Sequence, residues 1–315
     1  MKMIIKTADN IEHEIKNITR LTFSQSADAA CDSVWAYFKS ENVLGEAVSV
    51  RLFDGARLIF NGYCDCQKIT EDKDGFKVYI FARSGAALLV DNQAEPYTYF
   101  SPSGKQLCLL YANPFGIECA LPEIYSSESY QVSGSTSCYG AINQFVYFCT
   151  GYSIAVTPEN ELCLLTPSKD IKHFDDYTVL SVKSTINRSE PISIINYKDS
   201  FNADGYGHHT RSDFAASRQI NRCRYVNLNS LAPWQRDYTV LQRLKKSFDE
   251  YMLLELELAG YADEKLLQRF SFSSRIGNFD DYALVEKRYI CDENGSRTKL
   301  TLRKMIDVKE NTYVD

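Results

Sequence analysis

The feature that most constrains the fold of this chain is an alternation of apolar and polar residues between Gly45 and Pro96. Every second residue is apolar in three short runs of this stretch, which contain Val48, Val50 and Leu52, then Leu58 and Phe60, then Phe76, Val78 and Ile80. A period of two is typical of a strand with one buried and one exposed face. Asp54-Gly55 and Asp74-Gly75 separate the runs, and such pairs close tight hairpins because glycine accepts a positive φ. The stretch therefore predicts an antiparallel meander.

The same design returns near the end of the chain. Residues 72–83 (DKDGFKVYIFAR) and 292–303 (DENGSRTKLTLR) align without a gap. Each segment has a turn glycine, then an alternating strand, then an arginine. We interpret this short match as a sign that two similar β-domains flank a different central part.

Length and composition indicate a folded protein of two or three domains. The chain has 315 residues, of which 44% are hydrophobic and 24% are charged, as in ordinary globular proteins. Its aromatic content of 13%, with 21 tyrosines, favours β-structure and surfaces that bind other proteins. The net charge of -6 argues against a dedicated nucleic-acid-binding protein, because such proteins are usually basic.

The ten cysteines suggest a disulfide framework at first. However, the start MKMIIKTADN lacks the apolar core of a secretory signal, and no window approaches the roughly 18 apolar residues of a membrane span. We therefore expect reduced thiols and synthesis in a bacterial cytoplasm. Cys64 and Cys66 form the one close pair, without a second Cys or His pair at zinc-finger spacing, so we interpret them as buried small hydrophobes.

The first part of the chain, residues 1–96, continues the strand pattern towards the N-terminus. We expect strands at Met3–Ile5, Ile15–Phe23 and Val34–Phe38. The alanines around the third segment also suit a helix, but Trp35 and its aromatic and β-branched neighbours favour a strand.

In residues 97–168 the period changes to that of helices. Ser103 can cap a short helix that must end before Pro114, and a second helix runs from near Thr136 to a stop at Gly151. Strands follow these helices at Ile117–Ala120, Tyr152–Val156 and Leu162–Leu165. We expect a small α+β domain here.

Residues 169–315 return to strands. The segments with strand patterns are Tyr177–Ile186, Pro191–Tyr197, Met252–Leu258, Tyr282–Cys291 and Thr298–Arg303, the last two joined by an Asn294-Gly295 turn. Between them, residues 198–230 are polar and aperiodic, which predicts a long surface loop. One apolar stripe with Leu231, Trp234, Tyr238, Leu241 and Phe248 predicts a helix over residues 233–250.

Candidate catalytic or metal-binding residues are few. Among the four histidines, His13, His173, His208 and His209, the last two lie near Asp204 and Asp213, an arrangement that suits a metal, but solvated loop histidines are the more frequent case. The chain has no P-loop, dinucleotide fingerprint, HExxH or GxSxG motif.

Two further segments allow a functional and a structural interpretation. The run Gly134–Cys138 resembles a nucleophile loop, and a polar helix start explains it better. A cluster of arginines in the polar segment suits phosphate contact, although arginines on polar loops are usually solvated or paired; these are Arg211, Arg218, Arg222 and Arg224.

Several segments together resemble the baseplate hub proteins of contractile phage tails, the Mu-like or late control protein D family of bacteriophages and prophages. In the first part the similar segments are ITRLTFSQSADAACDSVWAYF, GEAVSVRLFDGARLIFNGYCDC and FARSGAALLVDNQAEP, the last with Arg83, Ser84, Leu89, Val90 and Asp91. Further on they are KQLCLLYANPFGIECAL, GSTSCYGAINQFVYFCTGYSIAVTPENELCLL and YALVEKRYICDENGSRTKLTLR. Residues 198–230 match no part of that pattern.

The resemblance implies a mainly β fold in which two similar antiparallel β-barrel domains, residues 1–96 and 169–315, flank a small α+β domain at residues 97–168. It implies a structural tail protein of the virion, assembled in the bacterial host cytoplasm, that forms a homotrimer. Its expected partners are the tail tube protein and the central spike protein, with transient contact to DNA in a central channel. It implies no catalytic residue, cofactor or metal.

Two other hypotheses remain open from the sequence. The many carboxylates allow a cell-wall-acting tail enzyme, a peptidoglycan hydrolase, although none of them is singled out by its surroundings. The two short helices between strands in residues 97–168 also suit a peptidoglycan-binding module.

Overall fold

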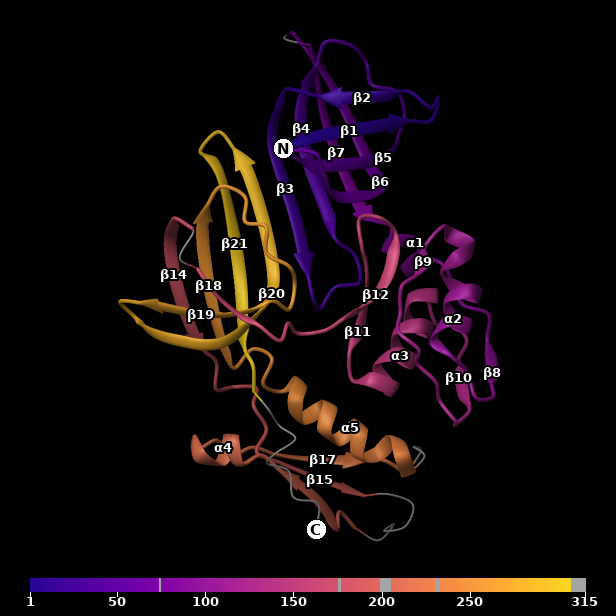
Figure 1. Cartoon of the computed structure of the whole chain (residues 1–315), viewed down its shortest axis with the longest axis vertical. Coiled ribbons are helices and arrows are strands. Elements are labelled where there is room, and N and C mark those ends of the chain that lie inside the picture. Colours follow the sequence, from indigo (N-terminus) through magenta and orange to yellow (C-terminus); the bar gives the residue numbers. More distant parts are fainter. Residues whose placement is uncertain (74, 175–176, 199–204, 230–232, 307–315) are drawn as a thin grey trace.

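The computed structural model describes residues 1–73, 75–174, 177–198, 205–229 and 233–306. Most of them lie in β-strands, and Figure 1 shows two curled sheets side by side with smaller α/β parts next to them. All ten cysteines are free thiols. None of the helices in the described residues is long and apolar enough to cross a membrane.

The first barrel is a curled antiparallel sheet with the strand order β3-β4-β7-β6-β5-β1-β2. Its strands are β1 (Lys2–Thr7), β2 (Glu12–Ile15), β3 (Ile18–Ser26), β4 (Ser33–Ser40), β5 (Ala47–Asp54), β6 (Arg57–Asp72) and β7 (Gly75–Ser84). The predicted meander is confirmed. Gly55 and Gly75 have φ values of 60° and 107° at the two hairpin turns, while Asp74 lies outside the described residues. The third predicted strand, β4, is also confirmed.

The core of the first barrel consists of the apolar residues on one side of each strand. On β4, for example, Val34, Ala36 and Phe38 are buried, whereas the residues between them are exposed. The alternation of apolar and polar residues in the sequence therefore reflects a sheet with one buried and one exposed face.

The second barrel repeats the order of the first. Its strands are β13 (Ile171–His173), β14 (Val179–Ile186), β18 (Met252–Ala259), β19 (Arg269–Ser274), β20 (Gly277–Asp292) and β21 (Gly295–Lys304). The antiparallel order β14-β18-β21-β20-β19 matches β3-β4-β7-β6-β5 strand for strand. The expected fold class, two similar antiparallel barrels around an α+β part, is confirmed.

The two barrels agree in detail as well as in order. Their long hairpins correspond at a constant offset of 220 residues, from Asp72 to Asp292 and from Gly75 to Gly295. In both, the register shifts eight residues before the turn aspartate, between Cys64 and Cys66 and between Leu284 and Glu286. The turn aspartate pairs with a cation five residues later in each case, Lys77 or Arg297. Differences remain at the edge, where β13 runs parallel to β19 but β1 runs antiparallel to β5.

The α+β part has its own apolar core. It contains α1 (Ala86–Asp91), β8 (Tyr97–Tyr99), α2 (Gly104–Tyr111), a 3-10 turn (Asn113–Phe115), β9 (Glu118–Cys119), β10 (Tyr130–Val132), α3 (Cys138–Thr150), β11 (Ser153–Val156) and β12 (Glu161–Leu165). The predicted caps are confirmed. Ser103 Oγ accepts from the Gln106 amide at 3.1 Å, and Gly151 ends α3 with a φ of 76°.

The prediction of a long surface loop over residues 198–230 is wrong. Its described part contains β16 (His208–Arg211), α4 (Asp213–Ser217) and β17 (Cys223–Asn227), which form a small sheet with β15 (Ile194–Lys198). The helix α5 (Pro233–Lys246) shares its apolar core, so the predicted helix is present but ends at Lys246. Few side chains of this polar segment are buried, such as Thr210 and Val226, which is too few to produce a periodic pattern.

Phe270 on β19 lies at the centre of the second barrel, 1% exposed, and its ring stacks on that of Phe174 with the centroids 4.2 Å apart. We expect Phe270→Ala to lower the free energy of unfolding by about 3–5 kcal/mol, because it leaves a cavity in a packed core. Chemical denaturation monitored by circular dichroism measures the change.

Phe100→Ala is the matched control, since that ring is 82% exposed. It should change the free energy of unfolding by less than about 0.5 kcal/mol. Equal effects of the two substitutions would contradict the assigned core.

Candidate assembly interface

The residues considered for metal binding lie in the small inserted sheet or on separate strands. His208 and His209 are on β16, and Asp213 is in the first turn of α4, whereas Asp204 lies outside the described residues. The His208 ring stacks on Tyr197 with the centroids 5.3 Å apart. Within the described ranges, no group of three or more His, Cys, Asp and Glu side chains is placed to hold a metal ion.

Three of the four arginines considered for phosphate contact make contacts within this insert or with the segment before it. Arg222 donates to the carbonyl of Pro191 at 3.0 Å, and Arg218 lies over the Phe214 ring at 4.4 Å. Arg224 donates to the carbonyl of the preceding residue, and Arg211 is exposed at the end of β16. Three of the four guanidinium groups therefore already have partners within the chain.

The loop that resembles a nucleophile site is a helix cap. Ser137 Oγ accepts from the Gly140 amide at 3.0 Å, and Cys138 is buried. Burial raises the pKa of the Cys138 thiol, which disfavours the reactive thiolate. Cys64 and Cys66 flank the bulge of β6, where burial raises the pKa of the Cys64 thiol to about 11.

The segment that ends the first barrel has a structural role. The Arg83 guanidinium donates to both oxygens of Asp65 in the β6 bulge, at 2.5 and 3.1 Å, and to both oxygens of Asp91 at the end of α1, at 2.6 and 3.1 Å. Ser84 Oγ accepts from the Asp32 amide at 3.1 Å, and Leu89 is fully buried. This motif therefore fixes the α+β part against the barrel.

The two barrels are joined edge to edge into one continuous sheet. Residues Glu286–Cys291 of β20 pair antiparallel with Leu21–Ser26 of β3. The Tyr289 side chain of β20 lies in the core of the first barrel, and its ring meets that of Tyr261 edge to face at 5.4 Å. One strand of the second barrel thus contributes to both cores.

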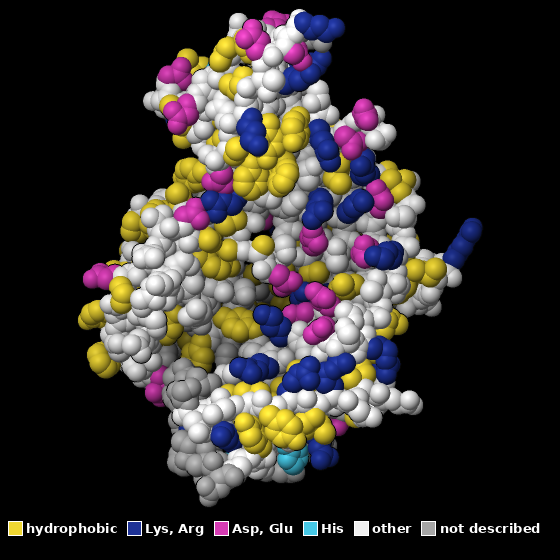
Figure 2. Space-filling view, turned by 180° about the vertical axis from the view of Figure 1, so that it is seen from behind, with side chains coloured by type: hydrophobic (Ala, Val, Ile, Leu, Met, Phe, Trp, Pro, Cys, Tyr) yellow, Lys and Arg dark blue, Asp and Glu magenta, His cyan; other side chains and the backbone are white. Residues whose placement is uncertain are grey.

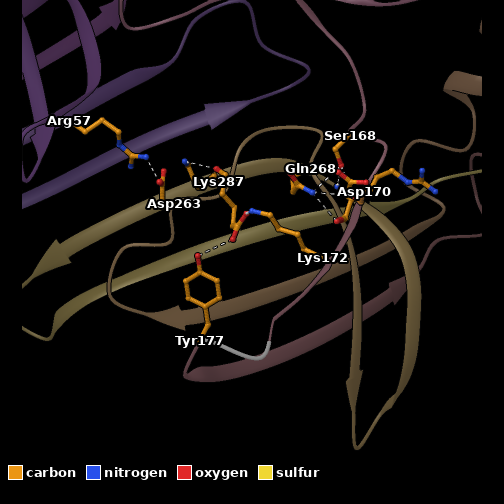
Figure 3. A network of polar contacts seen from close by, with 10 residues as sticks. Arg57, Ser168, Asp170, Lys172, Tyr177, Asp263, Gln268 and Lys287 are labelled. Carbon is orange, nitrogen blue, oxygen red and sulfur yellow. Dashed lines mark hydrogen bonds and ion pairs between the residues drawn. The ribbon is translucent and has the colours of Figure 1, made fainter.

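A polar network lies beside this junction (Figure 3). Lys287 Nζ donates to the Glu264 carbonyl at 2.8 Å, and the Glu264 carboxylate accepts from Tyr177 Oη at 3.0 Å and from Lys172 Nζ at 3.1 Å. Arg57, at the β5–β6 hairpin, pairs with Asp263. The network therefore ties a hairpin of the first barrel to the loop between β18 and β19 of the second.

A second group of contacts in Figure 3 attaches the chain segment that enters the second barrel. Ser168 Oγ accepts from Gln268 Nε2 at 3.0 Å and from the Arg269 amide at 2.9 Å, and Gln268 also donates to the Asp170 carbonyl at 3.2 Å. These bonds position β13 against β19.

At the junction, burial shifts the pKa values of two ionisable groups in opposite directions. Burial lowers the pKa of Lys287, which is 4% exposed, to about 8. Burial also raises the pKa of Asp32 to about 6, although a hydrogen bond from Gln25 and the charge of Lys287 lower it. No motif in the sequence singles out Lys287 or Asp32. The available signal was a lysine at a position of β20 that the alternation places inside the sheet.

Two edges of the continuous sheet, those of β14 and of β6 beyond its bulge, have no pairing partner among the described residues and correspond to the edges that join the two barrels. β14 pairs with β18 alone, and β6 beyond its bulge pairs with β7 alone. Exposed apolar residues lie on or near these edges, namely Ile69 on β6 and Leu180 and Ile186 on β14. An open edge with apolar side chains is suited to pairing with another chain.

No family model matches this chain, and no curated protein sequence matches it significantly. The fold does recur in solved structures. The 43 kDa tail protein of prophage MuSo2 from Shewanella oneidensis has a TM-score of 0.78 at 12% sequence identity, over 96% of this chain and 98% of that one.

A tail protein from Neisseria meningitidis MC58 has a TM-score of 0.74 at 13% identity, over 96% of each chain. The prophage tail protein gp18 from Listeria monocytogenes EGD-e has a TM-score of 0.61 at 11% identity, over 97% of this chain and 96% of that one. The chain therefore has the fold of these prophage tail proteins over nearly its full length.

Replacing Tyr289 tests the shared strand. We expect Tyr289→Ala to lower the free energy of unfolding by about 3 kcal/mol, because it opens a cavity in the core of the first barrel. Hydrogen exchange should show faster exchange in β3 and β4 as well as in β20. Arg288→Ala, at the exposed neighbouring position, is the control, and loss of protection confined to the second barrel would contradict the assignment.

Asp32 should make stability depend on pH. Its folded pKa of about 6 lies above the ordinary value of 3.8, so the protonated form favours the fold. This contribution is complete below about pH 4 and is lost as the pH rises through 6, a difference of up to about 3 kcal/mol. Asp32→Asn should therefore resemble the wild type near pH 4 and gain stability over it by pH 7, as urea denaturation at each pH measures. A difference that does not vary with pH would contradict the buried carboxyl.

Proposed function

We propose that this chain is a structural, non-enzymatic baseplate hub protein of a contractile phage tail or a phage-derived tail particle. Three copies form a ring that connects the tail tube to the central spike. The observation that carries the proposal is the pair of open edges on a chain whose two barrels are already joined edge to edge. The shared fold with three prophage tail proteins supports the tail location.

The junction within the chain serves as a template for the junction between copies. The β20 segment Glu286–Cys291 corresponds to Cys66–Glu71 of β6 at the constant offset. The β3 segment Leu21–Ser26 corresponds to Val182–Asn187, because β3 and β14 pair with equivalent residues of β4 and β18. The β3–β4 pairing and the β14–β18 pairing also have a register shift at the equivalent position. It lies between Ile18 and Arg20 in β3 and between Val179 and Ser181 in β14.

This correspondence gives the register of the contact between copies. Cys66–Glu71 of one copy pairs antiparallel with Val182–Asn187 of the next, so Cys66 lies opposite Asn187 and Glu71 lies opposite Val182. The pairing satisfies the main-chain groups of both open edges and buries Ile69 and Ile186.

A second contact follows from the same template. Within the chain, the β5–β6 hairpin reaches the loop between β18 and β19 through Arg57 and Asp263. The equivalent hairpin is β19–β20, with Ile276 at its tip, and the equivalent loop of the next copy contains Val43. These side chains are 57% and 65% exposed, so an apolar contact between copies replaces the ion pair within the chain.

Three copies, the number that the resemblance to phage hubs implies, give a ring of six barrels. We propose residues 1–96, 97–168 and 169–315 as the domains of each copy, the third with the inserted sheet and α5. The helix α1 at the end of the first domain packs into the core of the second. Two barrels per chain give this threefold ring a pseudo-sixfold arrangement of barrels.

A disulfide between copies tests this register. Residues directly opposite each other in antiparallel strands lie about 4.5–5.5 Å apart at Cα, which suits a disulfide. Asn187→Cys should therefore cross-link to the native Cys66 under mild oxidation, giving covalent dimers and trimers and no larger species on a denaturing gel at high protein concentration.

Two controls define the result. Asn187→Cys combined with Cys66→Ser should give no cross-link. Glu190→Cys, which places the thiol about 10 Å further along an extended chain, should give far less. Absence of cross-links in the first variant, or a ladder that continues beyond trimers, would overturn the proposed ring.

A further inference from the structure

Four aromatic side chains stand together on the face of the first barrel that points away from its core. Trp35 and Tyr37 on β4 are 48% and 43% exposed, and Tyr79 and Phe81 lie beside them on β7. Trp35 meets Phe81 edge to face at 5.5 Å, and Tyr37 meets Tyr79 at 4.9 Å. Exposed apolar groups of this size usually mark an interaction site.

A cationic pocket adjoins these aromatics. It has a volume of about 590 Å³, and its lining includes Tyr37, Tyr79 and three lysines, Lys39, Lys68 and Lys77, but no carboxylate among the described residues. Lys68 Nζ lies 5.5 Å from the centre of the Tyr79 ring. Figure 2 shows hydrophobic side chains bordered by Lys and Arg on the upper lobe, which β1–β7 form. We call the surface formed by the four aromatic residues and the three lysines the aromatic–lysine face.

The equivalent face of the second barrel has a different chemistry. At the positions of Trp35 and Tyr37 it carries Glu255 and Glu257, and at the positions of Tyr79 and Phe81 it carries Lys299 and Thr301. Its charges are largely paired within the face, as in Lys183–Glu255 at 2.6 Å and Arg297–Glu257 at 3.2 Å.

The repeated backbone therefore does not explain the aromatic–lysine face. A packing role would serve both barrels alike, yet the aromatic residues occur on one of them, where they lie beside Lys39 and Lys68. Lys77 is not part of this difference, because it pairs with Asp72 as Arg297 pairs with Asp292. The difference indicates a ligand that meets the first barrel and not the second.

We propose that the aromatic–lysine face binds an acidic polypeptide segment that also carries apolar side chains. Lysine ammonium groups and tyrosine hydroxyls donate to carboxylates, while the pocket beside the rings accepts an apolar side chain. The positive lining of the pocket complements the negative charge of such a segment.

The ring packing favours a peptide over single-stranded nucleic acid. Base stacking needs an open aromatic face. Here Tyr79 is in contact with Trp35, Tyr37 and Lys68, and Trp35 packs its ring edge to face with both Tyr79 and Phe81. The aromatic–lysine face therefore presents hydroxyl and ammonium groups to a ligand more readily than it presents flat ring surfaces for base stacking.

Its place in the particle rests on the proposed ring. Residues of β1 and β5 lie in the core together with Val34 and Ala36 of β4, so these strands cover the core side of the sheet and not the aromatic–lysine face. In the proposed ring, this uncovered face turns toward the axis. A ring of three copies then presents three aromatic–lysine faces to its channel, alternating with three faces of paired charges. The ligand is an acidic segment that enters this channel.

Binding can be measured on the isolated full-length protein. Trp35 is one of two tryptophans, so in a Trp234→Phe background its fluorescence reports on the face. A short synthetic peptide of Asp, Glu and Leu should change this fluorescence in a saturable way. Lys39→Glu with Lys68→Glu should weaken its binding by at least about tenfold, because both cations face the pocket.

The matched control is the equivalent face. Arg288→Glu with Lys299→Glu reverses two charges on the second barrel and should leave binding unchanged. A peptide with Asn and Gln in place of Asp and Glu should bind at least about tenfold more weakly. Absence of binding by the acidic peptide, equal loss in the control variant, or tighter binding of an oligothymidylate would overturn the proposal.

The outcome is separable from that of the ring. Binding by protein that fails to cross-link through Asn187→Cys would support this face and contradict the ring. Cross-linked trimers that do not bind the peptide would support the ring and overturn this inference.

Discussion

The structure depends on the pairing of β20 with β3. This strand pairing turns two separate barrels into one continuous sheet, and it requires β20 to be long, since its first half pairs with β19 and its second half with β3. The register shift between Leu284 and Glu286 lies where the strand changes partners. A bulge re-aims a strand, so this irregularity is what lets one strand contribute to two cores.

The polar groups beside the junction follow from the same pairing. The alternation of β20 places the Lys287 side chain on the buried face of the strand. Burying an ammonium group without a hydrogen-bond partner is costly, and Lys287 donates to the Glu264 carbonyl. Its counterpart in the first barrel is Gln67, whose amide reaches the carbonyl of Leu44 at 3.5 Å. The two side chains fasten equivalent loops, one with a buried charge and one without, so the charge is a specific property of the junction within the chain.

The sequence predicted local features well where one side chain or one turn decides them. The helix cap at Ser103, the helix end at Gly151, the hairpin glycines and the alternating strands all depend on neighbours within a few residues. It failed for residues 198–230, because strands there bury few side chains and pair with β15 and its neighbours through main-chain groups. The short strands β13 and β19 were missed for a similar reason, since they are held mainly by partners distant in sequence.

By itself the sequence determined the period of each element, the caps and turns, and the presence of two related β-domains around a helical part, because these rest on local stereochemistry and on the burial of one face. Only the tertiary structure decided that the barrels share a sheet, that Tyr289 lies in the core of the other barrel, and that the edges of β14 and of β6 beyond its bulge stay open among the described residues. Pairing between strands is made by main-chain groups that every residue carries, so its partners cannot be read from side-chain identity. The register and the open edges therefore emerge only when distant segments are brought together.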